Sequence, residues 1–268
     1  MKTVLVTGAT DGIGRETARQ LLARGLRVLV HGRSQSKAEH HARALAAGQP
    51  GAQTVAVWGD LSSMRQIVAL AEQVRSLAPT LDVLINNAGV FEKRRHLTED
   101  GFEMTIAVNH FAPYLLTRRL LTALKAAPAG RIVVVSSIAH ESSELALDDL
   151  TFSGGYDGYG AYAASKLANI LFTRALAERL GGTRVTVNAL HPGVIGTKLL
   201  RAGFGMGGAP VEEGARTSVY LATSDAVEGV SGRYFIDCRE VKPSPQARDH
   251  TLAEGLWRES ERLLAAFL

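Results

Sequence analysis

Near its start the chain reads Thr7-Gly8-Ala9-Thr10-Asp11-Gly12-Ile13-Gly14, between the apolar run Val4-Leu5-Val6 and a run with helical spacing. The glycines permit a tight turn and let the backbone approach a pyrophosphate, whose negative charge a helix N-terminus attracts. The sequence therefore predicts a dinucleotide-binding turn, with contacts at Gly8, Thr10, Asp11, Gly12, Ile13 and Gly14. A glycine-rich turn is weak evidence alone, but its place between a first strand and a first helix strengthens it.

The rest of the 268-residue chain alternates two kinds of segment. Short runs rich in β-branched residues occupy 4–6, 27–30, 54–57, 81–85, 131–135 and 185–187, and a strand-like segment follows at 233–238. Stretches with apolar residues three and four positions apart occupy 14–24, 36–47, 62–77, 98–125 and 161–180. The alternation predicts an α/β fold over residues 1–268: a single-domain, doubly wound Rossmann fold with a mostly parallel, seven-stranded sheet flanked by helices.

Candidate binding residues follow the strands at the edge where their carboxyl ends meet, which is where such sheets bind ligands. Asn86-Asn87-Ala88-Gly89 follows the fourth strand, Ser136-Ser137 the fifth and His191-Pro192-Gly193 the sixth. Two segments at this edge, 141–160 and 193–210, break the alternation and are rich in glycine or small polar residues. They are predicted to be substrate-covering loops, with ordinary surface loops as the alternative.

The end of the second strand bears on the choice of nicotinamide cofactor. An NAD-binding chain offers Asp or Glu to the adenosine ribose there, whereas this chain reads His31-Gly32-Arg33-Ser34. The guanidinium of Arg33 can pair with a 2′-phosphate, assisted by Arg15, which favours NADP(H) over NAD(H). The alternative is that Arg33 is merely solvated. Asp60 and Leu61, after the third strand, are candidate adenine contacts, although Asp60 can instead cap the next helix.

Tyr162 and Lys166 stand four residues apart in a predicted helix, so both side chains project from one face. A phenol titrates near ~10 in water, and a neighbouring ammonium favours the phenolate, so the pair can exchange protons. Taken alone, such a spacing usually places two polar side chains on a helix surface. Its position beside a dinucleotide turn favours an acid/base function.

Taken together, these motifs resemble the short-chain dehydrogenase/reductase family, from Thr3 to about Phe235. The pattern, in family order, comprises Thr7 to Gly14, Asn86 to Gly89, Asn109, Ser137, Tyr162 with Lys166, and Pro192-Gly193. The residues at 108–111, 136–140, 165–169 and 191–194, in and around these motifs, are similar to those of the branch that contains retinol dehydrogenases and their bacterial relatives. That branch is largely NADP-linked.

The resemblance implies a role for each site residue. Tyr162 would exchange a proton with the substrate oxygen, Lys166 would lower the Tyr162 pKa and hold the nicotinamide ribose, Ser137 would orient the substrate, and Asn109 would order a relay water. Further implied cofactor contacts are Asn87, Ala88, Gly89, Tyr162, Lys166, Pro192, Gly193 and Thr197. The implied activity is NADP(H)-dependent interconversion of a carbonyl and an alcohol on a small lipophilic molecule, by hydride transfer.

Three other functions are open to this sequence. Tyr159 has six residues between it and Lys166, the spacing of related enoyl reductases, although the intact 7–14 turn and Tyr162 count against that activity. Sugar epimerases share the tyrosine and lysine spacing but are longer and space their glycines differently. A non-catalytic NADP-sensing interaction protein would have lost catalytic residues, and all four are present here.

Composition excludes several other classes. The formal charge of +4 is spread along the chain, and the short run Lys93-Arg94-Arg95 is expected to be a solvated loop, so no nucleic-acid partner is expected. The single cysteine, Cys238, cannot form an internal disulfide and is expected to pack within the last strand. No histidine or cysteine spacing suits a metal site.

The chain shows no signal peptide and no apolar stretch long enough for a membrane span, so a cytoplasmic protein without a membrane partner is expected. His140 and His191 flank the predicted crevice, each as a substrate contact or a neutral structural imidazole. Apolar residues of 252–267 recur at helical spacing and suggest core packing or a lid edge. Relatives include monomers as well as homodimers and homotetramers that pair through the tyrosine helix, so the oligomeric state is open.

Overall fold

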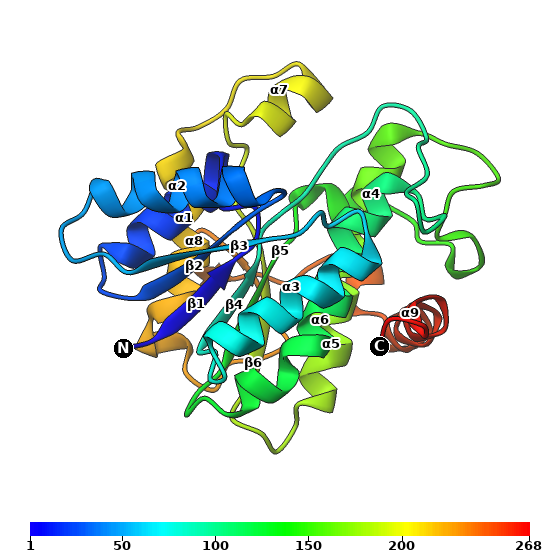
Figure 1. Cartoon of the computed structure of the whole chain (residues 1–268). Helices are drawn as coiled ribbons and strands as arrows, with labels where there is room; N and C mark the ends of the chain where they lie inside the picture. Colours follow the sequence, from blue (N-terminus) through cyan, green and yellow to red (C-terminus); the bar gives the residue numbers. More distant parts are fainter.

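The computed structural model describes residues 1–268 and contains one sheet of eight strands (Figure 1). The strands are β1 (Thr3–Val6), β2 (Arg27–Gly32), β3 (Thr54–Trp58), β4 (Val83–Asn86), β5 (Arg131–Val135), β6 (Thr186–His191), β7 (Tyr234–Ile236) and β8 (Arg239–Glu240). Their order is β3-β2-β1-β4-β5-β6-β7-β8, and all neighbours are parallel except β7 and β8. The apolar runs of the sequence are thus central strands covered on both faces.

The predicted seven strands are one too few, because the last strand-like segment is a hairpin. The chain reverses at Asp237 and Cys238, whose φ angles are 54° and 61°, and then adds β8. A two-residue hairpin turn needs positive φ at its central residues, which ends β7 at Ile236. Cys238 is therefore a half-buried turn residue rather than part of the strand.

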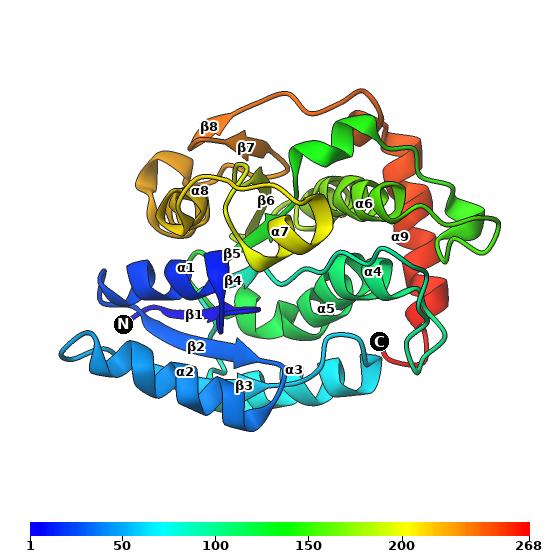
Figure 2. The same cartoon turned by 90° about the horizontal axis from the view of Figure 1, so that it is seen from above.

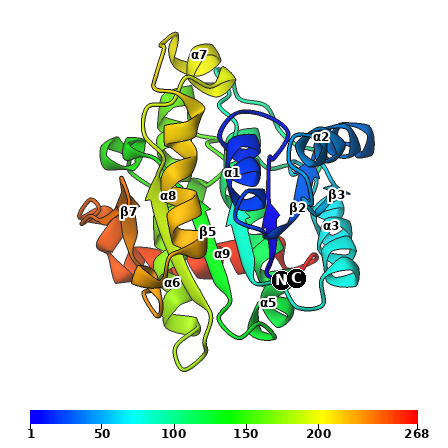
Figure 3. The same ribbon diagram turned by 90° about the vertical axis from the view of Figure 1, so that its left-hand side faces the viewer.

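Helices α1 (Gly12–Leu22), α2 (Gln35–Ala47) and α8 (Val211–Thr223) cover one face of the sheet, as Figure 3 shows. Their apolar sides form a core of 21 buried residues with the strands. Asp11 caps α1, since its carboxylate accepts the Gly12 N–H at 2.9 Å. The cap fixes the start of α1 at the carboxyl end of β1.

Helices α3 (Met64–Leu77), α5 (Ala112–Lys125) and α6 (Gly158–Arg179) cover the other face and share a larger core of 44 buried residues. The last helix, α9 (His250–Leu264), crosses α6 on the outside, as seen from above in Figure 2. The apolar residues noted at 252–267 belong here: Leu256, Trp257 and Leu264 are buried in this core. No helix combines the length and apolarity that crossing a membrane requires.

The helix predicted for 98–125 begins later and is irregular. Thr98 and Phe102 pair in a turn, and Glu103 then caps α4 (Met104–Ile106) by accepting the Ile106 N–H at 2.9 Å. A π-helical turn, Ala107–Phe111, joins α4 to α5. Its wider winding accommodates Asn109 and His110, both fully buried.

The two segments predicted as loops are partly helical. A 3₁₀ turn, Ile138–Ser142, extends into segment 141–160, which contains a second one, Leu147–Asp149, and whose last three residues already belong to α6. Segment 193–210 contains an unpredicted helix, α7 (Lys198–Phe204), capped by Thr197 and ended by Gly205 at a φ of 65°. In Figure 1 α7 lies above the carboxyl edge of the sheet.

Candidate active site

One cavity of about 860 Å³ opens at this edge, lined by residues that follow β1 to β6 and by α7. Every predicted cofactor contact lines it: Gly8, Thr10, Asp11, Gly12, Ile13, Gly14, Arg33, Asp60, Leu61, Asn87, Ala88, Gly89, Tyr162, Lys166, Pro192, Gly193 and Thr197. Of the predicted catalytic residues, Ser137, Tyr162 and Lys166 line it, whereas Asn109 lies behind the wall. Residues that are far apart in the sequence, from Gly8 to Thr197, therefore line one cavity.

The turn after β1 has the backbone expected of a dinucleotide site. Gly8 and Gly12 have φ angles of 66° and 50°, and a Cβ added to Gly14 would lie 2.3 Å from Gly8 O and Asn87 Nδ2. The N–H groups of Ile13 and Gly14 make no hydrogen bond within the chain and stand at the start of α1. Free amides at a helix N-terminus suit a phosphate group, so these residues fit a dinucleotide.

His31 holds this turn, a role that sequence reasoning missed. Its Nδ1 accepts the Gly8 N–H at 3.1 Å, and its Nε2 lies 3.0 Å from Gly59 O. The ring must therefore carry its proton on Nε2. Burial lowers the pKa of His31 to about 4, so it stays neutral and links the ends of β1, β2 and β3.

Basic side chains stand at the end of β2. Arg33 and Lys37 both line the cavity, and Lys37 was not singled out from the sequence. The Arg33 side chain is 71% exposed and lies 3.8 Å from Asp60 Oδ2. Asp60 accepts the N–H and hydroxyl of Ser62, whereas Ser63 caps α3. Asp60 therefore does not cap α3 but forms a long ion pair with Arg33, whose side chain stays largely exposed at the cavity.

Tyr162 and Lys166 share the cavity-facing side of α6. Lys166 Nζ lies 5.4 Å from the Tyr162 ring centroid and donates to Val135 O at 3.2 Å. Burial lowers the pKa of the Lys166 ammonium to about 8. Burial also raises the pKa of Tyr162 to about 12, which hydrogen bonding with Ser137 only partly offsets. The pKa of Tyr162 is thus raised rather than lowered as expected beside Lys166, and desolvation is the largest cause.

Asn109 braces the site from behind. Its Oδ1 accepts the Val90 N–H at 2.8 Å, and its Nδ2 donates to Val90 O and Ser165 Oγ, both at 3.0 Å. All its polar atoms are thus used within the protein. A Cβ added to Gly89 would meet both Asn109 Oδ1 and Lys166 Nζ, at 3.3 and 3.5 Å. Asn109 therefore lies next to Lys166 without reaching the cavity.

Two aromatic rings pack against Tyr162, and one of them, Phe204, lines the cavity. Phe91 and Phe204 have ring centroids 5.6 and 5.8 Å from that of Tyr162, and 4.9 Å from each other. Phe204 is the last residue of α7. Four of the nine exposed large apolar side chains of the protein also line this cavity: Ile138, Tyr159, Val194 and Met206. The space beside Tyr162 is therefore apolar.

The two histidines of the crevice differ. His140 is fully buried, with Nδ1 2.7 Å from Ser137 O and Nε2 accepting the Ser244 N–H at 3.2 Å. It is a structural imidazole. His191 lines the cavity, and burial lowers its pKa to about 4, so it faces a ligand as a neutral ring.

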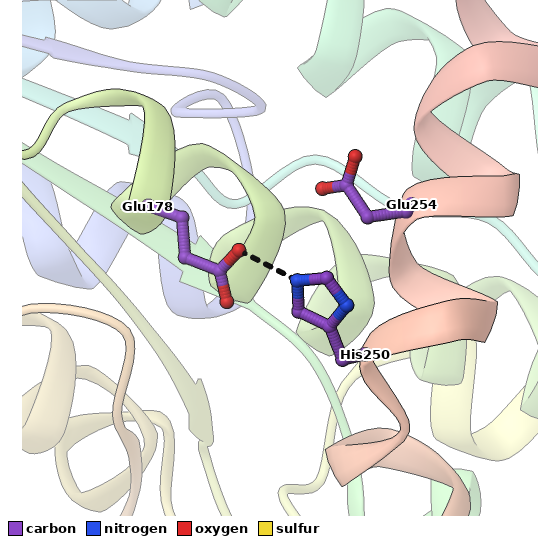
Figure 4. Close-up of side chains that lie close together, drawn as sticks. All are labelled: Glu178, His250 and Glu254. Atoms are coloured by element: carbon purple, nitrogen blue, oxygen red, sulfur yellow. Dashed lines mark hydrogen bonds and ion pairs between the residues drawn. The ribbon is translucent and has the colours of Figure 1, made fainter.

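A separate cluster of Glu178, His250 and Glu254 lies outside the cavity (Figure 4). Glu178 Oε2 is 3.1 Å from His250 Nε2, and both carboxylate oxygens of Glu254 accept from Arg179, at 2.6 and 2.8 Å. Glu254 is thus already paired with a cation. The cluster joins α6 to α9 through the Arg179–Glu254 ion pair and the contact between His250 and Glu178.

Known proteins resemble this chain along nearly all of its length. A family model described as short chain dehydrogenase matches residues 2–204. Retinol dehydrogenase 14 of Mus musculus is 46% identical over 97% of this chain and 85% of its own length. An uncharacterised protein from Mycobacterium paratuberculosis has a solved structure with a TM-score of 0.84 and 33% identity, covering 99% of this chain and 94% of that one.

A short-chain dehydrogenase from Escherichia coli, solved with NADPH, is similar with a TM-score of 0.74 and 26% identity, over 89% of this chain and 97% of that one. The glycine turn, the strand order and the Tyr162–Lys166 pair agree with these similarities. The chain therefore belongs to the short-chain dehydrogenase family of oxidoreductases.

Proposed function

We propose that the protein is an NADP(H)-dependent oxidoreductase that interconverts a carbonyl and an alcohol on a small lipophilic molecule. The observation that carries the proposal is the single cavity in which the glycine turn, Arg33 and the Tyr162–Lys166 pair meet an apolar wall. Relatives named retinol dehydrogenases, and a related structure solved with NADPH, support the same class of reaction.

The cofactor is held along the strand ends in this proposal. The amides of Ile13 and Gly14 meet the pyrophosphate, and Arg33 with Lys37 meets the 2′-phosphate. Lys166 holds the nicotinamide ribose, and Pro192, Gly193 and Thr197 face the nicotinamide side. When bound, the nicotinamide supplies or accepts the hydride.

The chain itself handles the proton. During reduction the Tyr162 hydroxyl donates its proton to the carbonyl oxygen as negative charge develops there, and during oxidation Tyr162 takes the alcohol proton. Its raised pKa keeps the phenol protonated at neutral pH, the form that reduction needs. Ser137 orients the substrate oxygen, and the Lys166 ammonium stabilises the phenolate that forms. Asn109 fixes the backbone at Val90 and the neighbouring Ser165 rather than contacting the substrate.

The test is consumption of NADPH with a panel of ketones, aldehydes and conjugated enoyl compounds, beside Tyr162→Phe. Ketone or aldehyde reduction that falls at least about a hundred-fold in the variant is expected, since a positioned proton donor contributes this much. Turnover that survives the change would refute the role of Tyr162. Reduction confined to the enoyl compounds would favour the enoyl reductase alternative.

The cofactor preference has its own test. Titration of the protein with NADPH and NADH, by quenching of protein fluorescence, is expected to give tighter binding of NADPH. Arg33→Ala should weaken NADPH binding and leave NADH binding unchanged, with Arg43→Ala, an exposed arginine of α2 outside the cavity, as the matched control. Equal affinities in the unaltered protein would contradict the preference.

The oligomeric state is tested separately. Measurement of the molar mass in solution by light scattering distinguishes a monomer from a homodimer or a homotetramer.

A further inference from the structure

A buried polar chain extends from Lys166 away from the cavity. The carbonyl oxygen of Val135, the last residue of β5, accepts from Lys166 Nζ at 3.2 Å and from Asn169 Nδ2 at 3.4 Å. Both donors come from α6, three residues apart. The carbonyl that holds the Lys166 ammonium is thus itself held by Asn169.

Asn169 in turn meets His110 of the π-helical turn. The two side chains are neighbours, and their facing polar atoms, Asn169 Oδ1 and His110 Nδ1, are both buried without a hydrogen-bond partner. His110 Nε2 lies 3.0 Å from Ser260 Oγ on α9. A small shift of either side chain would let a neutral imidazole with its proton on Nδ1 donate to Asn169 Oδ1 while Nε2 accepts from Ser260, which would satisfy all three groups.

Neither residue has another evident task. His110 and Asn169 are 0% and 2% exposed, and neither lines the cavity. Buried polar side chains in an apolar core cost free energy unless they are paired, and the bond that Asn169 does make is to the carbonyl that binds Lys166. The π-helical turn places two adjacent side chains in the core: Asn109 donates to Ser165, the residue before Lys166, and His110 neighbours Asn169.

We propose that Asn169 and His110 are positioning residues for Lys166. Asn169 fixes the Val135 carbonyl and hence the Lys166 ammonium, and His110 fixes the side-chain amide of Asn169. The contact between His110 and Ser260 connects these residues to α9. The inference rests on the proposed function of Lys166 as the partner of Tyr162.

Two variants of Asn169 test this directly. Asn169→Leu removes the donor at nearly constant volume and is expected to lower kcat about ten-fold, since small misplacements of a catalytic group cost at least this much. Asn169→Asp places a carboxylate near Lys166 and is expected to raise the Lys166 pKa by about one unit or more. That pKa is measured by nuclear magnetic resonance of ε-¹³C-labelled lysine, assigned with Lys166→Met. Tyr162 and His191 are titratable groups close to Lys166, and their protonation affects its pKa. All variants are therefore titrated over the same pH range.

Asn188 provides the matched control. It is 5% exposed in β6 and also bonds two backbone groups, at 2.7 and 3.0 Å, but it does not line the cavity. Asn188→Leu and Asn188→Asp should lower Tm like the Asn169 variants without changing kcat or the Lys166 pKa. His110→Phe should lower kcat in the same direction as Asn169→Leu, and the double variant should be less than additive.

The inference is overturned if the Asn169 variants lower only Tm, as the Asn188 variants do, and leave kcat and the Lys166 pKa unchanged. Failure of the proposed function is a different result: no turnover of any panel compound, or turnover retained by Tyr162→Phe. In that case the Lys166 pKa in Asn169→Asp still decides whether Asn169 acts on Lys166.

Discussion

The turn after β1 has no room for a side-chain carbon at Gly14. A methyl group on Gly14 would lie 2.3 Å from Gly8 O, in a residue whose N–H is bound by His31 Nδ1. Gly14→Ala is therefore expected to cost about 1–3 kcal/mol of stability and to weaken NADPH binding strongly. Urea denaturation and NADPH titration measure the two effects.

Gly207→Ala is the control for that change, because a Cβ there meets nothing within 4 Å and its backbone is unstrained. It should alter neither measurement. A Gly14→Ala protein as stable as the parent, with the same NADPH affinity, would show that the close approach seen here is not required.

Lys166 makes stability depend on pH in a defined window. Its pKa is about 8 in the folded protein and returns to about 10.5 on unfolding. Between these values the unfolded chain binds more protons, so the contribution of Lys166 to stability rises with pH. Lys166→Met is expected to flatten this rise. Thermal melts of both proteins from pH 7 to 10 give the difference, and parallel curves would contradict the lowered pKa.

At the scale of elements, α7 separates Tyr162 from solvent. Phe204→Ala would remove the ring that packs on Tyr162 and on Phe91, and is expected to raise KM for lipophilic substrates about ten-fold, within the range that loss of apolar packing produces. NADPH affinity should stay the same. Steady-state kinetics measure both.

Phe152→Ala is the comparison for Phe204→Ala, since Phe152 contacts Tyr156 outside the cavity. It should leave KM unchanged. An equal rise of KM in both variants would mean that general loosening, rather than the contact with Tyr162, is responsible.

The sequence predicted the regular elements better than the irregular ones. The 7–14 turn and the central strands follow from local patterns, because apolar runs and glycine spacing carry their own signal. Helix α7 was missed because Gly203, Gly205, Gly207 and Gly208 obscure its short apolar pattern. The π-helical turn at Asn109 has no local signal, since only tertiary burial of Asn109 and His110 reveals it.

For the candidate site, too, the sequence predicted residues that have a local signal and missed those that depend on tertiary contacts. Residues at strand ends were found because parallel strands bring their carboxyl ends to one edge. Contacts between distant elements were not, which is why His31, Lys37 and the aromatic cover of Phe91 and Phe204 were missed. The raised pKa of Tyr162 likewise depends on burial, which spacing along a helix cannot show.

At the scale of the molecule, a bound dinucleotide would join both halves of the sheet. Ligand that binds only the folded protein stabilises it by about 2.7 kcal/mol at one hundred times Kd. NADPH is therefore expected to raise Tm, and NADH at the same concentration to raise it less. Differential scanning fluorimetry measures this, with the Arg33→Ala protein expected to lose the difference between the two. Equal shifts in the parent protein would count against the role of Arg33.

The packing of α9 bears on assembly. Sixteen of the 22 residues of α6 are buried within one chain, and Trp257 of α9 stacks on Phe172 at a centroid distance of 6.1 Å. The outer side of the tyrosine helix is thus largely covered by the chain's own C-terminal helix. A partner copy that pairs through α6 would have to displace α9.

The ion pair between Asp11 and Lys198, with 2.6 Å between Oδ2 and Nζ, crosses from the glycine turn to α7. Both residues line the cavity, so this contact closes one side of it. Movement of α7 away from the glycine turn would therefore break this exposed ion pair. Because exposed ion pairs are screened by salt, the contact between the glycine turn and α7 should weaken as ionic strength rises.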